Sequence, residues 1–191
     1  TGRRATLSGM SLYHLADGRP VAAWVLTEQW GLLQQLTGDR PPVPLPTVSR
    51  VSATPLVTQL SAPAEHVALT GRLVESVWND GRRDVFPELV DDDCRLHLDD
   101  GSDPRGPDAY WQGVQRYRRG FPDLSVTIEE TVAEGDKVVV RTRVHGTQEG
   151  PFLGVEPTGN TVDVARLSVH HLADDRIAET GFVEDTVRLC H

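Results

Sequence analysis

The sequence predicts an α+β fold: a curved antiparallel sheet wrapped around helices to form a cone, preceded by a β-hairpin and a short helix. Two observations lead to this fold class. Apolar residues recur at helical spacing between residues 64 and 120, and four strand-like runs follow between residues 125 and 185. Long antiparallel strands after a helical start are typical of α+β domains. A sheet bent around helices encloses a conical cavity of the kind in which small ligands bind.

The composition is that of an ordinary globular chain. Of 191 residues, 38% are hydrophobic and 25% are charged, which is no signature of disorder. The net charge of −9 argues against nucleic acid as a partner, because phosphate binding needs a concentrated basic surface. No apolar run is long enough to span a membrane, and no signal peptide is visible. A cytoplasmic protein is therefore the default expectation.

Metal and cofactor sites are not predicted. The two cysteines, Cys94 and Cys190, are too few for a disulfide framework, and no Cys/His spacing resembles a zinc site. The run Asp91-Asp92-Asp93 is expected to be a solvated loop, because hard-cation sites need ligands at alternating positions of a defined loop. We therefore expect no cofactor.

The two ends of the chain resemble each other. Residues 1–33 align without a gap with residues 158–190, so that His14-Leu15-Ala16-Asp17 falls on His171-Leu172-Ala173-Asp174 and Glu28 falls on Asp185. Such self-similarity marks a repeat. It predicts a complete domain over residues 64–191, preceded at residues 1–38 by the C-terminal hairpin and helix of a second copy.

The first segment has the pattern of a hairpin followed by a helix. Alternating residues lead from Met10 to a turn that contains Asp17-Gly18, a strong hairpin signal because glycine accepts positive φ. The chain then extends through Val21–Leu26, and residues 28–36 are helix-compatible up to Gly38. An isolated hairpin is marginal in water, so we expect this one to lie on another sheet.

Residues 39–63 hold six of the thirteen prolines and predict an extended linker, because proline fixes φ and lacks a donor. Beyond it, apolar residues at helical spacing predict a helix of about four turns that ends at Asn79-Asp80-Gly81. The further predicted elements are a short helix near 84–90, a strand over 94–98, a helix over 106–120 and strands over 125–131, 137–145, 161–172 and 176–185.

Several motifs occur in a characteristic order. They are Trp78-Asn79-Asp80-Gly81, Phe121-Pro122-Asp123-Leu124, the glycine-rich run 146–154, Pro157-Thr158-Gly159 and the turn at 172–177. In this order they resemble the SnoaL-like polyketide cyclase family, within the nuclear-transport-factor-2-like superfamily. The resemblance covers residues 64–191, and residues 1–38 resemble the C-terminal third of a second copy. It implies a cystatin-like α+β barrel with a conical cavity.

The resemblance also implies a chemistry: cofactor-free intramolecular aldol closure of a polyketide ester, with a carboxylate as general acid/base. By position that carboxylate is Asp185, and His171, fourteen residues earlier, would assist the carbonyl or its enolate. Asn79 and His97 match positions at the rim of the cone. The remaining candidates for substrate binding are Tyr110, Trp111, Gln148 and Phe152. The chain departs from the family pattern at Gly181, Gln148 and Asp175, where the family commonly has Trp, His and Gly.

Each candidate also has a plain structural explanation. Asp185 at a strand end is suited to capping the next turn. His171 can be a structural histidine whose hydrogen bonds are satisfied, and His97 an ordinary residue of its strand. Tyr110 and Trp111 are expected in the core. The face that Asp185 shares depends on the hairpin register, since a slip of one residue exchanges the two faces. Such a slip would bring His170 to the cavity in place of His171.

Two hypotheses follow. In the first, the chain is a cofactor-independent cyclase or isomerase that acts on a hydrophobic small molecule, because removing a proton next to a carbonyl needs a base near the carbon and a donor near the oxygen. In the second, the chain is a non-catalytic ligand-binding or assembly module, in which the cone is plugged and the sheet face forms a homodimer. The position of Asp185 and His171 relative to a connected pocket distinguishes the two hypotheses.

Overall fold

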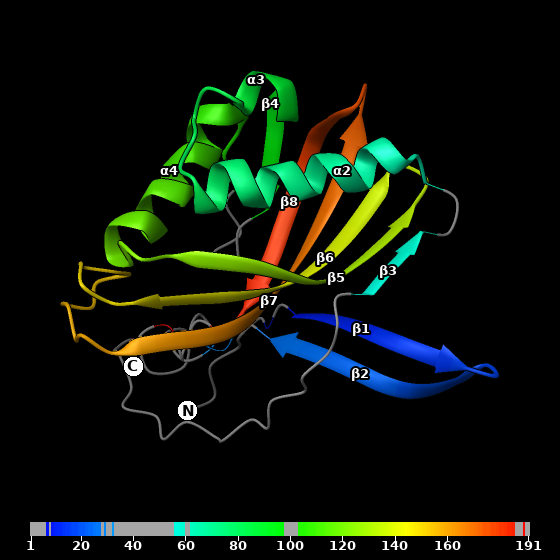
Figure 1. Cartoon of the computed structure of the whole chain (residues 1–191), viewed down its shortest axis with the longest axis horizontal. Coiled ribbons are helices and arrows are strands. Elements are labelled where there is room, and N and C mark those ends of the chain that lie inside the picture. The colour runs from blue at the N-terminus through cyan, green and yellow to red at the C-terminus, as the bar shows by residue number, and fades with distance from the viewer. Residues whose placement is uncertain are drawn as a thin grey trace, which may run out of the picture.

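The computed structural model describes residues 7, 9–27, 29, 32, 56–59, 62–97, 103–185 and 189. Its centre is a six-stranded sheet with the strand order β3-β5-β6-β7-β8-β4. The strands are β3 (Leu56–Gln59), β4 (Val90–His97), β5 (Ser125–Glu134), β6 (Lys137–Thr147), β7 (Thr161–Ala173) and β8 (Arg176–Glu184). A separate hairpin of β1 (Gly9–Ala16) and β2 (Arg19–Thr27) lies beside it (Figure 1).

The central sheet is mixed rather than purely antiparallel. The four strands β5 to β8 form the predicted antiparallel meander. At the two edges, β3 pairs with β5 and β4 pairs with β8, both in parallel. These edge strands stand earlier in the chain than their partners, and helices lie between each edge strand and its partner. Parallel strands need such a long connection, so the edge pairing follows from where the helices fall in the sequence.

The helices cover one face of this sheet, as predicted (Figure 1). They are α2 (Ala64–Arg72), the π-helix η1 (Leu73–Asn79), α3 (Phe86–Leu89) and α4 (Gly106–Gly120). Residues that recur along α4, namely Tyr110, Val114 and Tyr117, are buried against the sheet. No helix in the described part of the chain has the length and apolar character needed to cross a membrane.

The first predicted helix of the complete domain changes type in its middle. It is α-helical up to Arg72 and continues from Leu73 as a π-helix, in which each N–H bonds the carbonyl five residues earlier. The N–H of Asp80 accordingly donates to the carbonyl of Glu75 at 3.0 Å. A π-helix needs more residues per turn than an α-helix and shifts the face that follows it. Here that face carries Val74, Val77 and Trp78, which are all buried.

The three aspartates expected in a solvated loop lie instead in β4. They fall between Val90 and Arg95, where the pairing with β8 is interrupted by a bulge. Asp92 and Asp93 are exposed, and the Asp91 carboxylate is 2.9 Å from Arg176. A bulge leaves residues of one strand unpaired and bends that strand locally. The run of aspartates can therefore belong to a strand although two of its three side chains are exposed.

The closing hairpin of β7 and β8 has a tight turn at Asp174-Asp175, where both residues have positive φ, 48° and 57°. A turn of this kind matches the twist of the strands it joins. It sets a register in which Arg166 faces Glu184 and His170 faces Thr180. This register decides which of the adjacent histidines points toward the helices.

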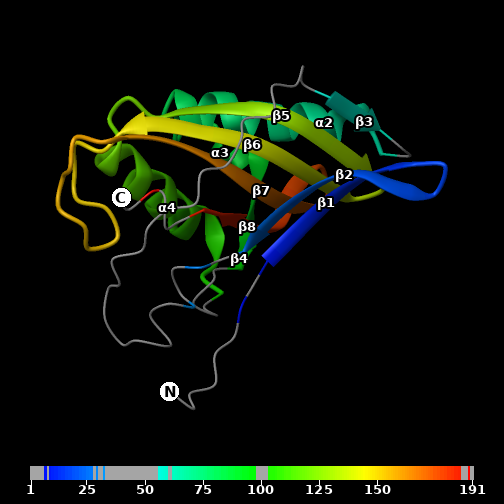
Figure 2. The same ribbon diagram turned by 90° about the horizontal axis from the view of Figure 1, so that it is seen from below.

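The N-terminal hairpin packs on the other face of the central sheet, where β2 contacts β7 and β8 (Figure 2). The Trp24 ring lies 4.5 Å from the Arg141 guanidinium, and His14 Nε2 contacts Glu130. Arg141 Nε also donates to Glu130 at 3.2 Å, and both side chains are buried. The hairpin thus covers a buried ion pair on the face away from the helices.

The opposite face of this hairpin is exposed and apolar. Its large hydrophobic side chains, each more than half exposed, are Tyr13, Leu15, Val21 and Val25. In the alignment of the two chain ends, Tyr13 corresponds to His170 and Val25 to Phe182, which both face the helices in the complete domain. The partial second copy stays a prediction. Of the helix predicted at 28–36 only residues 29 and 32 are described, and of the linker 39–63 only β3 and residues 62–63.

Replacing Trp24 by Ala tests this docking. Loss of the contact with Arg141 removes a stacking interaction of about 1 kcal/mol and uncovers the buried pair beneath it. We expect amide hydrogen exchange in β1 and β2 to accelerate about tenfold while exchange in β5 to β8 is unchanged. Val25→Ala, on the exposed face, is the matched control. Equal protection in Trp24→Ala and the wild type would show that the hairpin is not held by this contact.

Candidate functional site

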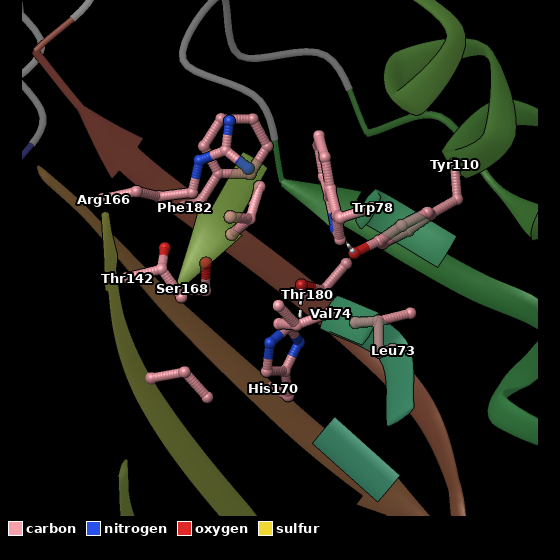
Figure 3. Close-up of a pocket in the computed structure, with 12 residues that line it drawn as sticks. Leu73, Val74, Trp78, Tyr110, Thr142, Arg166, Ser168, His170, Thr180 and Phe182 are labelled. Atoms are coloured by element: carbon pink, nitrogen blue, oxygen red, sulfur yellow. Dashed lines mark hydrogen bonds between the residues drawn. The ribbon is translucent and has the colours of Figure 1, made fainter. Parts of the chain in front are cut away.

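A cavity lies between the helices and the covered face of the sheet (Figure 3). Its helical wall is formed by η1 and α4, and its other wall by the four strands β5 to β8. The lining residues are Leu73, Val74, Trp78, Tyr110, Val126, Val140, Thr142, Arg166, Ser168, His170, Thr180 and Phe182. The helical wall is mainly apolar, whereas the strand wall carries three hydroxyl groups, an imidazole and a guanidinium group.

The free space in this cavity is small, about 20 Å³. That is room for about one water molecule, so side chains fill most of the cone. The cavity as it stands therefore accommodates a single small group rather than a whole drug-sized ligand, and a larger molecule requires side chains of the wall to move.

Arg166 lies among three aromatic rings of the interior. Its guanidinium carbon lies 4.4 Å from the Trp78 ring, 4.7 Å from Tyr117 and 4.6 Å from Phe182. Aromatic faces attract a cation, most strongly where water is excluded, and the side chain is only 3% exposed. Burial lowers the pKa of Arg166 to about 10, so the group is a cation at neutral pH.

Glu184 neutralises this cation from the neighbouring strand. Arg166 Nε donates to Glu184 Oε2 at 2.9 Å, and Nη2 lies 2.8 Å from the same oxygen. The Tyr117 hydroxyl donates to the other carboxylate oxygen. A buried ion pair is tolerated when its lone pairs and protons find partners. Sequence reasoning missed both residues, although opposite charges directly across a hairpin were a readable signal once the turn was assigned.

Two polar atoms of the lining stay without a hydrogen-bond partner among the described residues: Arg166 Nη2 and Thr142 Oγ1. The contact of Nη2 with Glu184 is an ion pair that lacks the alignment of a hydrogen bond. Arg166 and Thr142 face each other on β7 and β6. Unpaired buried polar atoms are rare, and two on adjacent positions of one cavity are a feature that the packing alone does not explain.

His170 is the titratable base of the cavity. Thr180 Oγ1 lies 2.9 Å from His170 Nδ1, across the hairpin. Burial lowers the pKa of His170 to about 4, so the imidazole is neutral at pH 7. Opposite it on α4, Tyr110 accepts a hydrogen bond from Trp78 Nε1 at 3.4 Å, and burial raises the pKa of Tyr110 to about 12. Tyr110 therefore keeps its proton.

The two residues predicted to be catalytic do not line the cavity. His171 points to the other face of the sheet, where its Nε2 lies 2.8 Å from Asp136 Oδ2. Asp185 follows the last residue of β8 and is half-buried, and its carbonyl accepts a hydrogen bond from Leu189 N at 3.3 Å. The register brings His170 and Glu184 to the helix side, one position earlier on each strand. His170 and Glu184 are fourteen residues apart, as the predicted pair His171 and Asp185 is, but the pair on the helix side of the sheet is the one that sequence reasoning did not choose.

The rim candidates His97 and Asn79 make structural contacts instead. His97 lies between Asp103, at 2.9 Å, and Glu179, at 3.1 Å, and these carboxylates, Glu179 foremost, raise the pKa of His97. Asn79 exchanges two hydrogen bonds with the backbone of Val126, at 3.0 and 2.7 Å. These bonds fasten the end of η1 to β5, so Asn79 positions the helical wall without reaching the cavity.

Of the other substrate-binding candidates, only Tyr110 lines the cavity. The Trp111 ring packs edge-on against Phe86 at 5.8 Å. Phe152 is buried between Tyr117, at 4.9 Å, and Phe121, at 5.1 Å. Gln148 accepts a hydrogen bond from Thr158 Oγ1 at 2.8 Å and donates to carbonyls of its own loop. These three residues therefore stabilise α4 and the loop between β6 and β7, outside the lining of the cavity.

The fold and cavity define a class of protein, the α+β cones in which a curved sheet and a helical layer enclose an interior cavity. The comparison of sequences identifies the family within this class. The profile of the SnoaL-like polyketide cyclases matches residues 68–191, more than half of the chain. The chain therefore belongs to the SnoaL-like polyketide cyclase family. No curated protein matches its sequence.

Several solved structures resemble the chain. A candidate SnoaL-like polyketide cyclase from Jannaschia sp. CCS1 shares 34% identity, with a TM-score of 0.62 over 65% of this chain and 88% of its own. TsrD from Streptomyces laurentii shares 25% identity, with a TM-score of 0.61 over 66% and 92%. IdmH from Streptomyces antibioticus, a candidate polyketide cyclase, shares 26% identity, with a TM-score of 0.57 over 64% and 94%.

The buried pair predicts a strong coupling between two substitutions. Arg166→Met leaves the Glu184 charge without its cation, and Glu184→Gln leaves the cation without its carboxylate. Each change should lower the free energy of unfolding by about 3 kcal/mol or more. The double variant removes both charges and should lose about 2 kcal/mol less than the sum of the single variants. Urea unfolding of the three variants measures this, and simple additivity would contradict the coupling.

The lowered pKa of His170 predicts a dependence of stability on pH. Between its ordinary value of 6.5 and about 4, the unfolded chain binds a proton that the folded chain does not, so this group reduces stability as the pH falls through that range. Between pH 7 and pH 5 the loss is about 2 kcal/mol. His170→Gln should lose correspondingly less over this interval. Urea unfolding at both pH values compares the two proteins, and parallel losses would contradict the assignment to His170.

Proposed function

We propose that the chain is a cofactor-independent acid/base enzyme that acts on a hydrophobic small molecule, as a polyketide cyclase or a related isomerase. The observation that carries the proposal is the neutral imidazole of His170, held in the same cavity as the buried cation of Arg166. Chemistry next to a carbonyl needs this combination, a base for the carbon acid and positive charge or donors for the oxygen. The family supports the same reaction class.

His170 is the proposed base, in place of His171. Thr180 Oγ1 is within hydrogen-bonding distance of Nδ1 of the imidazole. When Nδ1–H donates to Thr180 Oγ1, the lone pair is on Nε2, and Nε2 takes the proton from the carbon next to the substrate carbonyl. The electrons of that C–H bond form an enolate. In an isomerase the imidazolium returns the proton to a different carbon. In a cyclase the enolate carbon attacks a second carbonyl, and the resulting alkoxide takes the proton.

The low pKa of His170 has two consequences for this step. It keeps the base unprotonated at pH 7, which is the state that the reaction needs. It also makes the imidazolium costly, so the negative enolate beside it must offset part of that cost. Activity should therefore persist into mildly acidic solution, because at least half of the His170 side chains stay unprotonated down to a pH of about 4.

Hydrogen–deuterium exchange of 2-tetralone in D₂O tests the proposal. This apolar ketone has acidic C–H bonds next to its carbonyl, and NMR follows their loss without knowledge of the natural substrate. The wild type should accelerate the exchange, and His170→Gln should slow it by about 100-fold. His171→Gln is the matched control, because the adjacent imidazole lies on the opposite face of β7 and should leave the rate unchanged.

Asp185→Asn is a third arm of the same assay. Asp185 remains the carboxylate that the family resemblance indicates, and it lies one residue beyond Glu184. If Asp185→Asn abolishes exchange while His170→Gln does not, the acid/base group lies at the end of β8 and the assignment to His170 is wrong. If 2-tetralone exchanges no faster with the wild type than in buffer alone, the enzymatic proposal fails.

The small free space of about 20 Å³ favours a second candidate, a non-catalytic module of the same fold. In this case the Arg166–Glu184 pair and the three rings around it fill the cone as a structural core. Such a module would neither exchange 2-tetralone nor bind small apolar compounds. Its functional surface would be the sheet face away from the helices, of which the N-terminal hairpin covers a part.

A further inference from the structure

Two buried polar atoms of the cavity wall lack a hydrogen bond within the described part of the chain, although one of them, Arg166 Nη2, lies 2.8 Å from Glu184 Oε2 in an ion pair. Arg166 and Thr142 are 3% and 2% exposed, and Arg166 Nη2 and Thr142 Oγ1 have no hydrogen-bond partner among the described residues. The two residues are direct partners across β6 and β7, and both line the same cavity (Figure 3). Leaving a buried donor unpaired is costly, which points to a ligand atom between them.

The arrangement is rigid in a way that suits binding. Three rings lie within 4.7 Å of the Arg166 guanidinium, and Glu184 accepts from Nε at 2.9 Å. The guanidinium is therefore fixed before any ligand arrives, so binding needs little reorganisation. Thr142 lies in the middle of β6, between β5 and β7. Its backbone is therefore held on both sides, and the freedom that remains is rotation of the hydroxyl group.

Size and charge select the ligand group. About 20 Å³ of free space takes one oxygen atom without movement of the wall, whereas the rest of a ligand requires side chains of the wall to move. Glu184 already balances the charge of Arg166, with Nη2 and Oε2 2.8 Å apart. A second full anion would lie close to this carboxylate and be repelled. A neutral carbonyl oxygen, which accepts two hydrogen bonds and can gain negative charge, suits both limits.

We propose that Arg166 Nη2 and Thr142 Oγ1 form an oxygen-binding subsite, in which both donate to one carbonyl or enol oxygen of an apolar ligand. The proposal rests on the function proposed above and specifies its substrate. Arg166 and His170 are four residues apart on β7, roughly 13 Å between Cα atoms. A substrate that reaches both presents a carbonyl or enol oxygen to Arg166 and Thr142 and a C–H bond next to a carbonyl to His170.

Binding of 2-naphthol, an aromatic enol, tests the subsite, with naphthalene as the probe that lacks the oxygen. The wild type should bind 2-naphthol at least about tenfold more tightly than naphthalene, the value of one good hydrogen bond. Thr142→Val keeps the shape of the side chain and removes the hydroxyl. It should bind 2-naphthol about tenfold more weakly, leave naphthalene binding unchanged and keep the wild-type melting temperature or exceed it. Thr142→Ser restores the hydroxyl and should restore the preference.

A preference for 2-naphthol that survives in Thr142→Val would overturn the subsite, and so would a wild type that binds neither probe. The exchange of 2-tetralone separates this result from the function itself. If 2-naphthol binding depends on Thr142 but 2-tetralone does not exchange, the subsite stands and the enzymatic proposal fails. If exchange occurs while the preference does not depend on Thr142, the enzyme stands and the subsite fails.

Discussion

The interior of the cone is organised by the need to neutralise one buried cation. A guanidinium removed from water is costly unless a carboxylate and polarisable surfaces replace the water, and Arg166 has both, in Glu184 and in the rings of Trp78, Tyr117 and Phe182. These groups come from three parts of the fold: Trp78 from η1, Tyr117 from α4, and Phe182 and Glu184 from β8. The ion pair therefore ties the helical layer to the sheet, inside the cone where a ligand would bind.

The fold was largely readable from the sequence because its signals are local. Helical spacing over residues 64–120 and turn residues such as Asp17-Gly18 and Asp174-Asp175 each determine a short stretch of backbone. Two features were not local. The parallel edge pairing of β3 and β4 depends on where distant helices lie, and the π-helical form of Leu73–Asn79 depends on packing against the sheet.

The site was harder to predict, because a strand has two faces and the choice between them is made by pairing. The spacing of fourteen residues is shared by His171 with Asp185 and by His170 with Glu184, and only the register of β7 on β8 places the second pair inward. Residue types gave no help either, since Gln148 and Asn79 hold backbone in place. Arg166 was missed because a buried arginine is rare, and its one signal, the opposite charge of Glu184 across the hairpin, depends on the same register.

The π-helix gives the site an unusual sensitivity to the local backbone hydrogen bonds. An α-helix advances about 100° per residue, and the seven residues of η1 form wider π turns with a smaller step. If the same residues continued as an ordinary α-helix, Trp78 would swing away from Arg166, even though every amino acid around the cation stayed the same. The backbone between Arg72 and Asp80 is therefore itself part of the cavity wall, and side-chain identity alone does not define the site.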